Sequence, residues 1–381
     1  MVGVHGFCDE RFASIRDLFC AGLERGIDEG ASYAVALNGQ LVVDLWGGYR
    51  DLARTKPWEA ETVVGVASTS KVIVAIATLM LWDRDLLDLD EPIATYWPGF
   101  AQNGKAAVTP RQVLLHNSGL PGFGCAPTFD ESFDLDRMAG VIERAALWYE
   151  PGTVTCYHSG TFGYILGELV RRVSALPFAQ FVSEEITEPL GADFHYMFTE
   201  SRDLARVAEL WPAQGPQEAL NPMGEKVVAE MAPMVRDFER SGIPPGVIPG
   251  ASGLTNARAL VRIGSIMAMG GEVDGRRYLS RHAVEDAVTE HSYAEDQVLG
   301  PVRRGLFFAL DSQEFPAPTP TTIHWGGHGG SWLTMDPATG ISCAYTPNRF
   351  LVGDEWLRRQ AKQWQVLIEV LRGIGDQVDS R

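Results

Sequence analysis

Positive charge is scarce in this chain of 381 residues, which carries 32 Lys and Arg against 49 Asp and Glu, a formal net charge of −17. A field of that sign repels phosphate backbones and anionic lipid head groups, so we expect neither nucleic acid nor a membrane as a partner. Cysteine is also sparse, since the five residues are scattered and form no C-x-x-C pair. This argues against a disulfide framework and against a zinc knuckle.

Signals of export and of membrane insertion are lacking as well. The start of the chain has neither a basic segment nor a continuous apolar run, so we expect no secretory signal and a cytoplasmic protein. The most apolar stretch, residues 63–82, approaches the length of a membrane span, but the polar run Ser68-Thr69-Ser70-Lys71 interrupts it. A buried core helix is the better interpretation.

The sequence also lacks the motifs of several enzyme classes. It contains no Gly-x-Ser-x-Gly element, which excludes an esterase of the α/β-hydrolase type, and no phosphate loop or dinucleotide fingerprint. His324 and His328 lie four residues apart in an extended glycine-rich segment, where that spacing does not bring two imidazoles together as it would on a helix. We therefore expect no metal ion and no cofactor.

The chain does have enough apolar residues, 45%, to bury a large core. Helical periodicity over residues 10–27 predicts an opening helix with Gly30 as its stop signal. Residues 33–37 and 41–46 flank Asn38-Gly39, a dipeptide typical of the tight turn of a β-hairpin. The first part of the chain therefore predicts a helix followed by two antiparallel strands.

Strand patterns return near the end of the chain, at residues 305–310, 331–335 and 341–346, before a closing helix over 355–371. Helical periods predominate in between. We predict a discontinuous α/β sheet lobe made of residues 1–84 and 301–381, and a mostly helical lobe made of residues 85–300. The active site is expected in the crevice between the two lobes.

Ser68-Thr69-Ser70-Lys71 is an S-x-x-K tetrad at the start of the apolar helix, so Ser68 and Lys71 share one helix face. A serine hydroxyl is a weak nucleophile until a neighbouring group accepts its proton, and a desolvated lysine is neutral enough to do so. The alternative is an N-cap serine beside a surface lysine. A surface lysine has no reason to begin a helix that is apolar on every face.

Two further segments carry polar groups suited to catalysis. Tyr157 and Ser159 precede an apolar helix, and Tyr157 offers a phenol that a nearby cation such as Lys71 would turn into a base. The glycine-rich run Trp325-Gly326-Gly327-His328 leads into a strand, where an edge strand can present an N–H to an oxyanion. Taken singly, a packed turn tyrosine and a hairpin with a glycine bulge explain them equally well.

Taken in order, Ser68-x-x-Lys71, Tyr157-x-Ser159 and Trp325-Gly326-Gly327 resemble the three signature elements of the serine β-lactamase and penicillin-binding-protein superfamily. The branch that the chain resembles most contains the class C β-lactamases and the family VIII carboxylesterases, and further matching segments are residues 96–100, 109–121, 249–254 and 335–337. The resemblance implies a β-lactamase/transpeptidase-like fold of the α/β plus α class. Such a fold has an antiparallel sheet flanked by helices, with an inserted, mostly helical lobe.

The resemblance also implies roles for the residues at the matching positions. Ser68 resembles the acylated nucleophile, and Lys71 and Tyr157 the pair that removes and returns its proton. The backbone N–H groups of Ser68 and His328 are expected to form the oxyanion hole. Ser159 stands where lactamases usually have asparagine, and we expect it to bond Lys71 or the acyl carbonyl.

The third motif departs from the lactamase pattern, because Trp325 stands where lactamases and transpeptidases have the lysine that helps to hold a substrate carboxylate. Trp325, Gly326 and Gly327 are then expected to border a neutral substrate. We predict a serine hydrolase that cleaves short-chain carboxylic esters of small molecules. The alternatives are a β-lactamase or D-amino acid amidase or peptidase with the same machinery, an acyltransferase, and a catalytically silent scaffold.

Loops over residues 122–147 and 200–250 are expected to wall the crevice and to set the acyl-chain length. Cys156, next to Tyr157, is expected to be a small packing residue, since thiolate activation needs a positive neighbour. The oligomeric state does not follow from the sequence.

Overall fold

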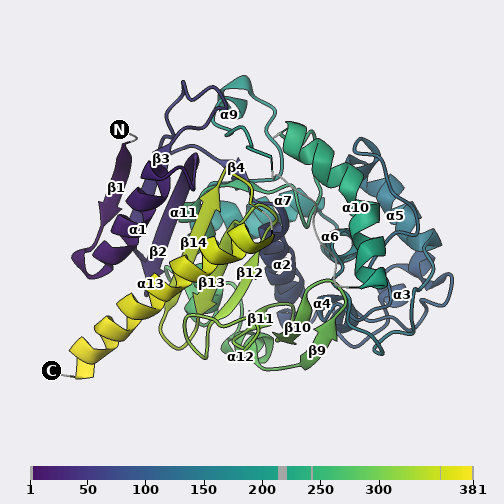
Figure 1. Cartoon of the computed structure of the whole chain (residues 1–381). Coiled ribbons are helices and arrows are strands. Elements are labelled where there is room, and N and C mark those ends of the chain that lie inside the picture. The colour runs from purple at the N-terminus through teal and green to yellow at the C-terminus, as the bar shows by residue number, and fades with distance from the viewer. Residues whose placement is uncertain (1–2, 213–220, 242, 352, 380–381) are drawn as a thin grey trace.

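The computed structural model describes residues 3–212, 221–241, 243–351 and 353–379 (Figure 1). Within these residues, both ends of the chain contribute to one nine-stranded antiparallel sheet with the order β1-β3-β2-β14-β13-β12-β11-β10-β9. Its strands are β1 (Val4–Cys8), β2 (Gly30–Leu37), β3 (Gln40–Gly48), β9 (Ser292–Asp296), β10 (Gly300–Arg304), β11 (Ala309–Leu310), β12 (Ile323–Gly326), β13 (Trp332–Asp336) and β14 (Ile341–Pro347).

Helices cover both faces of the sheet. On one face α1 (Ala13–Glu24) and α13 (Gly353–Asp379) pack against each other and against every second residue of β2, such as Tyr33 and Val35. On the other face α11 (Ala257–Ala268) packs on β2, β13 and β14, where Ala34 and Ala36 belong to the main core. The period of two along β2 thus separates two apolar layers.

A second group of helices lies to one side of the sheet, at the right of Figure 1. At its centre α2 (Lys71–Asp83) packs against α6 (Thr161–Ser174), and both are almost wholly buried. The other elements are η2 (Ala67–Ser70), α3 (Ile93–Tyr96), η3 (Pro98–Ala101), α4 (Pro110–Leu114), η4 (Glu131–Phe133), α5 (Leu135–Arg144), α7 (Phe178–Val182), η5 (Ser183–Thr187), α8 (Glu188–Leu190), α9 (Ser201–Leu204) and α10 (Pro222–Ser241).

Short elements complete the fold. Three small strands, β4 (Val64–Gly65), β6 (Leu254–Thr255) and β5 (Phe194–His195), form a separate sheet beside η2. The remaining elements are η1 (Glu10–Phe12), β7 (Glu272–Val273), β8 (Arg276–Arg277) and α12 (Arg281–Val288). β9 belongs to the large sheet and α11 packs on it, so some residues numbered below 301 are part of the sheet and its covering helices. The lobe limits at residues 85 and 300 stay predictions.

Several predicted elements are present. The hairpin forms as β2 and β3, and its turn residues Asn38 and Gly39 have φ of 51° and 75°, as a two-residue hairpin turn requires. The opening helix ends at Glu24, earlier than predicted, because Gly26 with φ of 65° already terminates it. None of the helices in the described ranges is long and apolar enough to cross a bilayer, and residues 63–82 fold as β4, η2 and the core helix α2.

The strand predicted at residues 305–310 is wrong over most of its length. β10 ends at Arg304, and the chain turns through residues 305–308 before the two-residue β11. Phe307 adopts a φ of 79°, and its ring is fully buried against Trp325 with centroids 4.7 Å apart. The apolar residues of this segment therefore fill the core beside β12 instead of pairing as a strand.

Candidate active site

The predicted nucleophile and its lysine lie in consecutive turns. Ser68 is in η2 and Lys71 is the first residue of α2, which brings Lys71 Nζ to 3.0 Å from Ser68 Oγ. Ala67, immediately before Ser68, has a φ of 45°, a conformation that costs energy for a residue with a side chain. Strain of this kind concentrates at functional sites.

Lys71 is fully buried. Burial lowers the pKa of its ammonium from 10.5 to about 7, so a large share of Lys71 is neutral at physiological pH. Its second hydrogen bond goes to the carbonyl oxygen of Gly250 at 3.1 Å. Among the described residues, Ser159 is not a hydrogen-bond partner of Lys71, so the first of the two contacts expected for Ser159 is not made, and its contact with an acyl carbonyl stays a prediction.

Tyr157 lies on the turn before α6, with the centroid of its ring 5.2 Å from Lys71 Nζ. Burial raises the pKa of its phenol to about 12, and hydrogen bonding with Ser68 only partly opposes this rise. Tyr157 is therefore a neutral phenol at pH 7. This differs from the expectation that Lys71 would act as the cation that lowers the phenol's pKa, because burial makes a large share of Lys71 neutral.

Trp325 is on β12 and faces Tyr157, with ring centroids 5.5 Å apart. Its indole N–H lies close enough to the phenol to oppose the rise in the pKa of Tyr157, but Nε1 is buried without a partner in hydrogen-bond geometry. β12 is not the edge strand that we expected, because β11 lies beside it. However, β11 pairs only with Ile323 and His324, which leaves Trp325 and Gly326 uncovered on that side.

The predicted oxyanion segment packs directly against the turn that carries Ser68. A Cβ atom on Gly327 would lie 2.2 Å from the carbonyl oxygen of Val66, so only glycine allows β12 to approach η2 so closely. Ser331 Oγ donates a hydrogen bond to the same Val66 carbonyl at 2.8 Å and lies 2.9 Å from Thr69 Oγ1. These contacts fix the backbone around His328 relative to the backbone of Ser68.

Helix α10 lies over this region. Glu239 Oε1 of α10 is 2.7 Å from His328 Nε2, and Glu230 of the same helix accepts a hydrogen bond from the backbone N–H of Phe123 at 2.8 Å. Residues 222–241 of the wall expected from a loop over residues 200–250 are therefore a helix; residues 213–220 and 242 lie outside the described residues.

Comparison with known proteins agrees with this geometry. The family model described as Beta-lactamase matches residues 15–367. The chain belongs to the β-lactamase family. It is 34% identical over 371 residues to the esterase/beta-lactamase LipL of Mycobacterium tuberculosis, a match that covers 91% of this chain and 83% of LipL. It is thus a serine hydrolase of the β-lactamase family.

Solved structures of relatives confirm the predicted β-lactamase/transpeptidase-like fold. A family VIII carboxylesterase superposes with a TM-score of 0.87 at 29% identity, covering 97% of this chain and 100% of the other. A penicillin-binding protein homologue from Caulobacter crescentus superposes with a TM-score of 0.85 at 31% identity, covering 97% of this chain and 99% of the other.

In this member of the β-lactamase family a buried ion pair supports the Tyr157 turn, and the sequence reasoning missed it. Asp296 and Arg304 are both fully buried and lie 2.7 Å apart. Asp296 Oδ1 also accepts a hydrogen bond from the backbone N–H of Tyr157 at 3.1 Å. The sequence offered no local signal for this pair, because Asp296 is far from Tyr157 along the chain.

Two buried histidines hold the same turn. His158 Nδ1 donates to the Cys156 carbonyl at 2.7 Å, so its Nε2 accepts from the Ser118 hydroxyl at 2.6 Å. His116 Nδ1 accepts from the His158 backbone N–H at 3.2 Å, and the His116 ring packs edge-on against Tyr157. Burial lowers the pKa of His158 to about 4 and that of His116 well below 6.5, so both are neutral and serve to position the turn.

The sequence drew attention to one cysteine and to a pair of histidines as well, and their contacts are those of packed side chains. Cys156 is buried, and burial raises the pKa of its thiol to about 12, which leaves it unreactive. His324 packs edge-on against Trp364 with centroids 4.8 Å apart, whereas His328 pairs with Glu239. Within the described residues, no group of three His, Cys, Asp or Glu side chains is arranged to hold a metal ion.

Proposed function

We propose that this protein hydrolyses short-chain carboxylic esters through an acyl-enzyme on Ser68. The observation that carries the proposal is the 3.0 Å contact between Ser68 Oγ and the fully buried, partly neutral Lys71. The ring that packs against Tyr157 is the indole of Trp325 and not a second cation. The names of LipL, an esterase/beta-lactamase, and of the solved family VIII carboxylesterase support the same reaction class.

In the acylation step, Ser68 Oγ attacks the ester carbonyl carbon and its proton passes to neutral Lys71. The backbone N–H groups of Ser68 and His328 donate to the resulting oxyanion. The bond to the leaving alkoxide then breaks, and Tyr157, which is still protonated at pH 7, supplies the proton that converts the alkoxide to an alcohol. Lys71 then gives its proton to the Tyr157 phenolate, which leaves a neutral lysine and a neutral phenol for deacylation.

Deacylation repeats these steps with water as the nucleophile. Water loses a proton to Lys71, the tetrahedral intermediate collapses, and Ser68 recovers its proton as the carboxylic acid leaves. An alcohol in place of water would make the same enzyme an acyltransferase. Ser159, beside the turn that carries Tyr157, is proposed to contact the acyl carbonyl.

Apolar side chains around the site support a neutral, short-chain substrate. A Cβ on Gly160 would meet Met231 Sδ at 2.7 Å and Phe123 Cζ at 2.8 Å, and a Cβ on Gly65 would meet Phe238 Cζ at 2.7 Å. Phe123 and residues of α10 therefore reach both turns that carry the reacting groups. A β-lactam carboxylate would meet Trp325 where related enzymes offer a lysine.

Parallel assays of wild type and Ser68→Ala against p-nitrophenyl butyrate and nitrocefin test the proposal. We expect the wild type to turn over the ester and to cleave little nitrocefin. Ser68→Ala should lose at least about a thousandfold of the ester turnover. Dominant nitrocefin cleavage would favour a β-lactamase, and full ester turnover by Ser68→Ala would refute the mechanism. Labelling by a fluorophosphonate separates these outcomes from a silent scaffold, in which Ser68 would stay unmodified. Residence in the cytoplasm also stays a prediction, tested by fractionating cells.

A further inference from the structure

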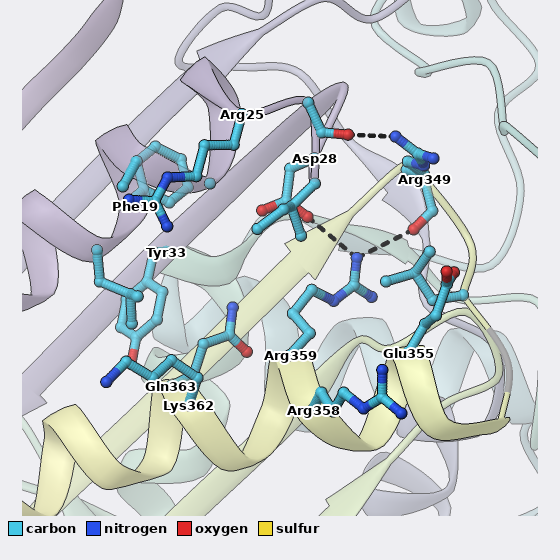
Figure 2. A pocket seen from close by; sticks show the side chains of 16 residues that line it. Phe19, Arg25, Asp28, Tyr33, Arg349, Glu355, Arg358, Arg359, Lys362 and Gln363 are labelled. Atoms are coloured by element: carbon cyan, nitrogen blue, oxygen red, sulfur yellow. Dashed lines mark hydrogen bonds and ion pairs between the residues drawn. The ribbon is translucent and has the colours of Figure 1, made fainter.

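A pocket of about 420 Å³ lies between α1 and α13, and none of the proposed catalytic residues lines it (Figure 2). Helix α1 and the segment after it form one side, and α13 forms the other. Gly26 has open space where a side chain would stand, and a Cβ on Gly22 would meet the Asp28 carboxylate at 2.8 Å. The volume falls within the range of roughly 300–1,000 Å³ that small-molecule sites have.

The pocket combines an apolar lining with a positively charged rim. Phe19 and Leu351 are buried in its lining, and Ile27 leaves 42% of its surface exposed there. Arg25 comes from the α1 side of the pocket and Lys362 from α13 (Figure 2), and both side chains are exposed. An exposed isoleucine beside exposed cations is the pattern of a site for a ligand with an apolar body and a negative end.

The charge of this lining is opposite to that of the protein. Five of the lining residues are Arg or Lys, namely Arg25, Arg349, Arg358, Arg359 and Lys362, and two are acidic, Asp28 and Glu355. Asp28 is already engaged, because Arg359 Nη1 lies 3.0 Å from its Oδ1 and Tyr345 donates to the same oxygen. In a chain with a net charge of −17, such a concentration of cations is a local exception that favours an anion.

We propose that this pocket binds an aliphatic carboxylate, with its hydrocarbon chain against Phe19, Ile27 and Leu351 and its carboxylate between Arg25 and Lys362. Among the described lining residues, Glu355 is the one acidic side chain besides the engaged Asp28, so an anion meets more opposite charge here than a cation does. A polar anion such as phosphate would leave the apolar lining uncovered. Binding at this pocket does not depend on the proposed ester hydrolysis.

The pocket is connected to the candidate oxyanion hole through Arg359. From the wall of the pocket, Arg359 Nη2 donates to the carbonyl oxygen of Gly329 at 2.6 Å, and Gly329 follows His328 directly in the chain. With the carboxylate at the rim, the hydrocarbon chain fills the space beside the wall that Arg359 forms. Occupancy therefore shifts Arg359 and with it the His328 segment, and lowers kcat more than it raises KM, a consequence that rests on the proposed function.

Calorimetric titration of the protein with sodium octanoate tests the binding site, with octylamine as the oppositely charged probe. Saturable binding of octanoate is expected, together with an affinity at least about fivefold weaker in Arg25→Glu/Lys362→Glu and in Ile27→Ser, all at exposed positions. Arg202→Glu, at a cation 79% exposed outside the pocket, is the matched control and should bind octanoate as wild type does. Equal affinity in the pocket variants and the control, or equal binding of octylamine, would overturn the proposal.

Two further measurements locate the ligand and test the connection. Co-crystals with 8-bromooctanoate should show anomalous bromine density between α1 and α13, and density only near Ser68 would contradict the site. In ester assays, octanoate should lower the kcat of wild type and of Arg202→Glu but not of the Arg25→Glu/Lys362→Glu variant. Binding that leaves kcat unchanged would refute the connection through Arg359, while absence of any ester turnover would refute the proposed function and leave the binding result standing.

Discussion

Replacing Lys71 with methionine should make the protein more stable in acid, although it removes the proposed base. Lys71 is fully buried, and burial lowers its pKa from 10.5 to about 7. Since each pH unit between these values corresponds to about 1.4 kcal/mol, holding Lys71 charged in the folded protein costs about 5 kcal/mol below pH 7. Methionine avoids this cost but gives up the hydrogen bonds to Ser68 and Gly250, so we expect Lys71→Met to gain about 3 kcal/mol at pH 6.

The advantage of Lys71→Met should shrink as the pH rises. Because the pKa of Lys71 is lower in the folded than in the unfolded state, the unfolded state binds about one more proton between pH 7 and 10.5. The stability of the wild type therefore increases with pH across this window, relative to the variant. Between pH 6 and pH 9 the difference should fall by about 3 kcal/mol, which leaves the two proteins nearly equal.

Urea denaturation of wild type and Lys71→Met at pH 6, 7.5 and 9 measures this difference, with Ser68→Ala as a control that keeps the lysine. All other titrating groups contribute almost equally to both proteins and cancel. A difference in unfolding free energy that stays constant from pH 6 to pH 9 would show that the pKa of Lys71 is not lowered by burial. The proposed role of Lys71 as base would then fail as well.

Four other substitutions, one of them a control, test the remaining parts of the site. Trp325→Phe keeps an aromatic ring but removes the indole N–H beside the phenol, and we expect kcat for p-nitrophenyl butyrate to fall about tenfold while KM changes little. Gly327→Ala should abolish turnover, because the added Cβ would lie 2.2 Å from a carbonyl oxygen. Gly326→Ala should keep most of the turnover, because the nearest neighbour of its Cβ would be at 3.3 Å. Equal loss of turnover in both variants would contradict the packing argument. Asp296→Asn leaves Arg304 as an uncompensated buried charge and should lower the unfolding free energy by about 3–5 kcal/mol, and a loss below about 1 kcal/mol in urea denaturation would contradict this.

The features that the sequence predicted well depend on short-range patterns. Asn38-Gly39 specifies a hairpin turn by backbone conformation alone. The spacing of Ser68 and Lys71 is enough to bring their side chains together on adjacent helical turns. The order of the three motifs carried the resemblance, and the family comparison confirms the fold that the resemblance implied.

The features that the sequence did not predict depend on contacts between distant segments. The carbonyl of Gly250 accepts a hydrogen bond from Lys71, and the Asp296 carboxylate accepts one from the backbone of Tyr157. The sequence around Gly250 and around Asp296 has no pattern from which these partners could be predicted. Residues 305–308 were part of a predicted strand because the segment is apolar. Only the space around Trp325 decides that Phe307 turns inward with a positive φ. β1, with the burial pattern of an exposed edge strand, lacks the alternation that marks a strand in a sequence.

Trp325 also explains how the two titratable groups of the site divide their work in the proposed mechanism. A lysine at that position would place a second cation near Tyr157 and would favour the phenolate, so the tyrosine could accept protons. With an indole there, burial dominates and holds the pKa of Tyr157 at about 12, whereas burial of Lys71 holds its pKa at about 7. Desolvation thus raises the pKa of Tyr157, whose protonated form is neutral, and lowers the pKa of Lys71, whose protonated form is charged. At neutral pH it leaves a lysine ready to accept a proton beside a tyrosine ready to donate one, which is the arrangement that an ester needs when an alkoxide leaves.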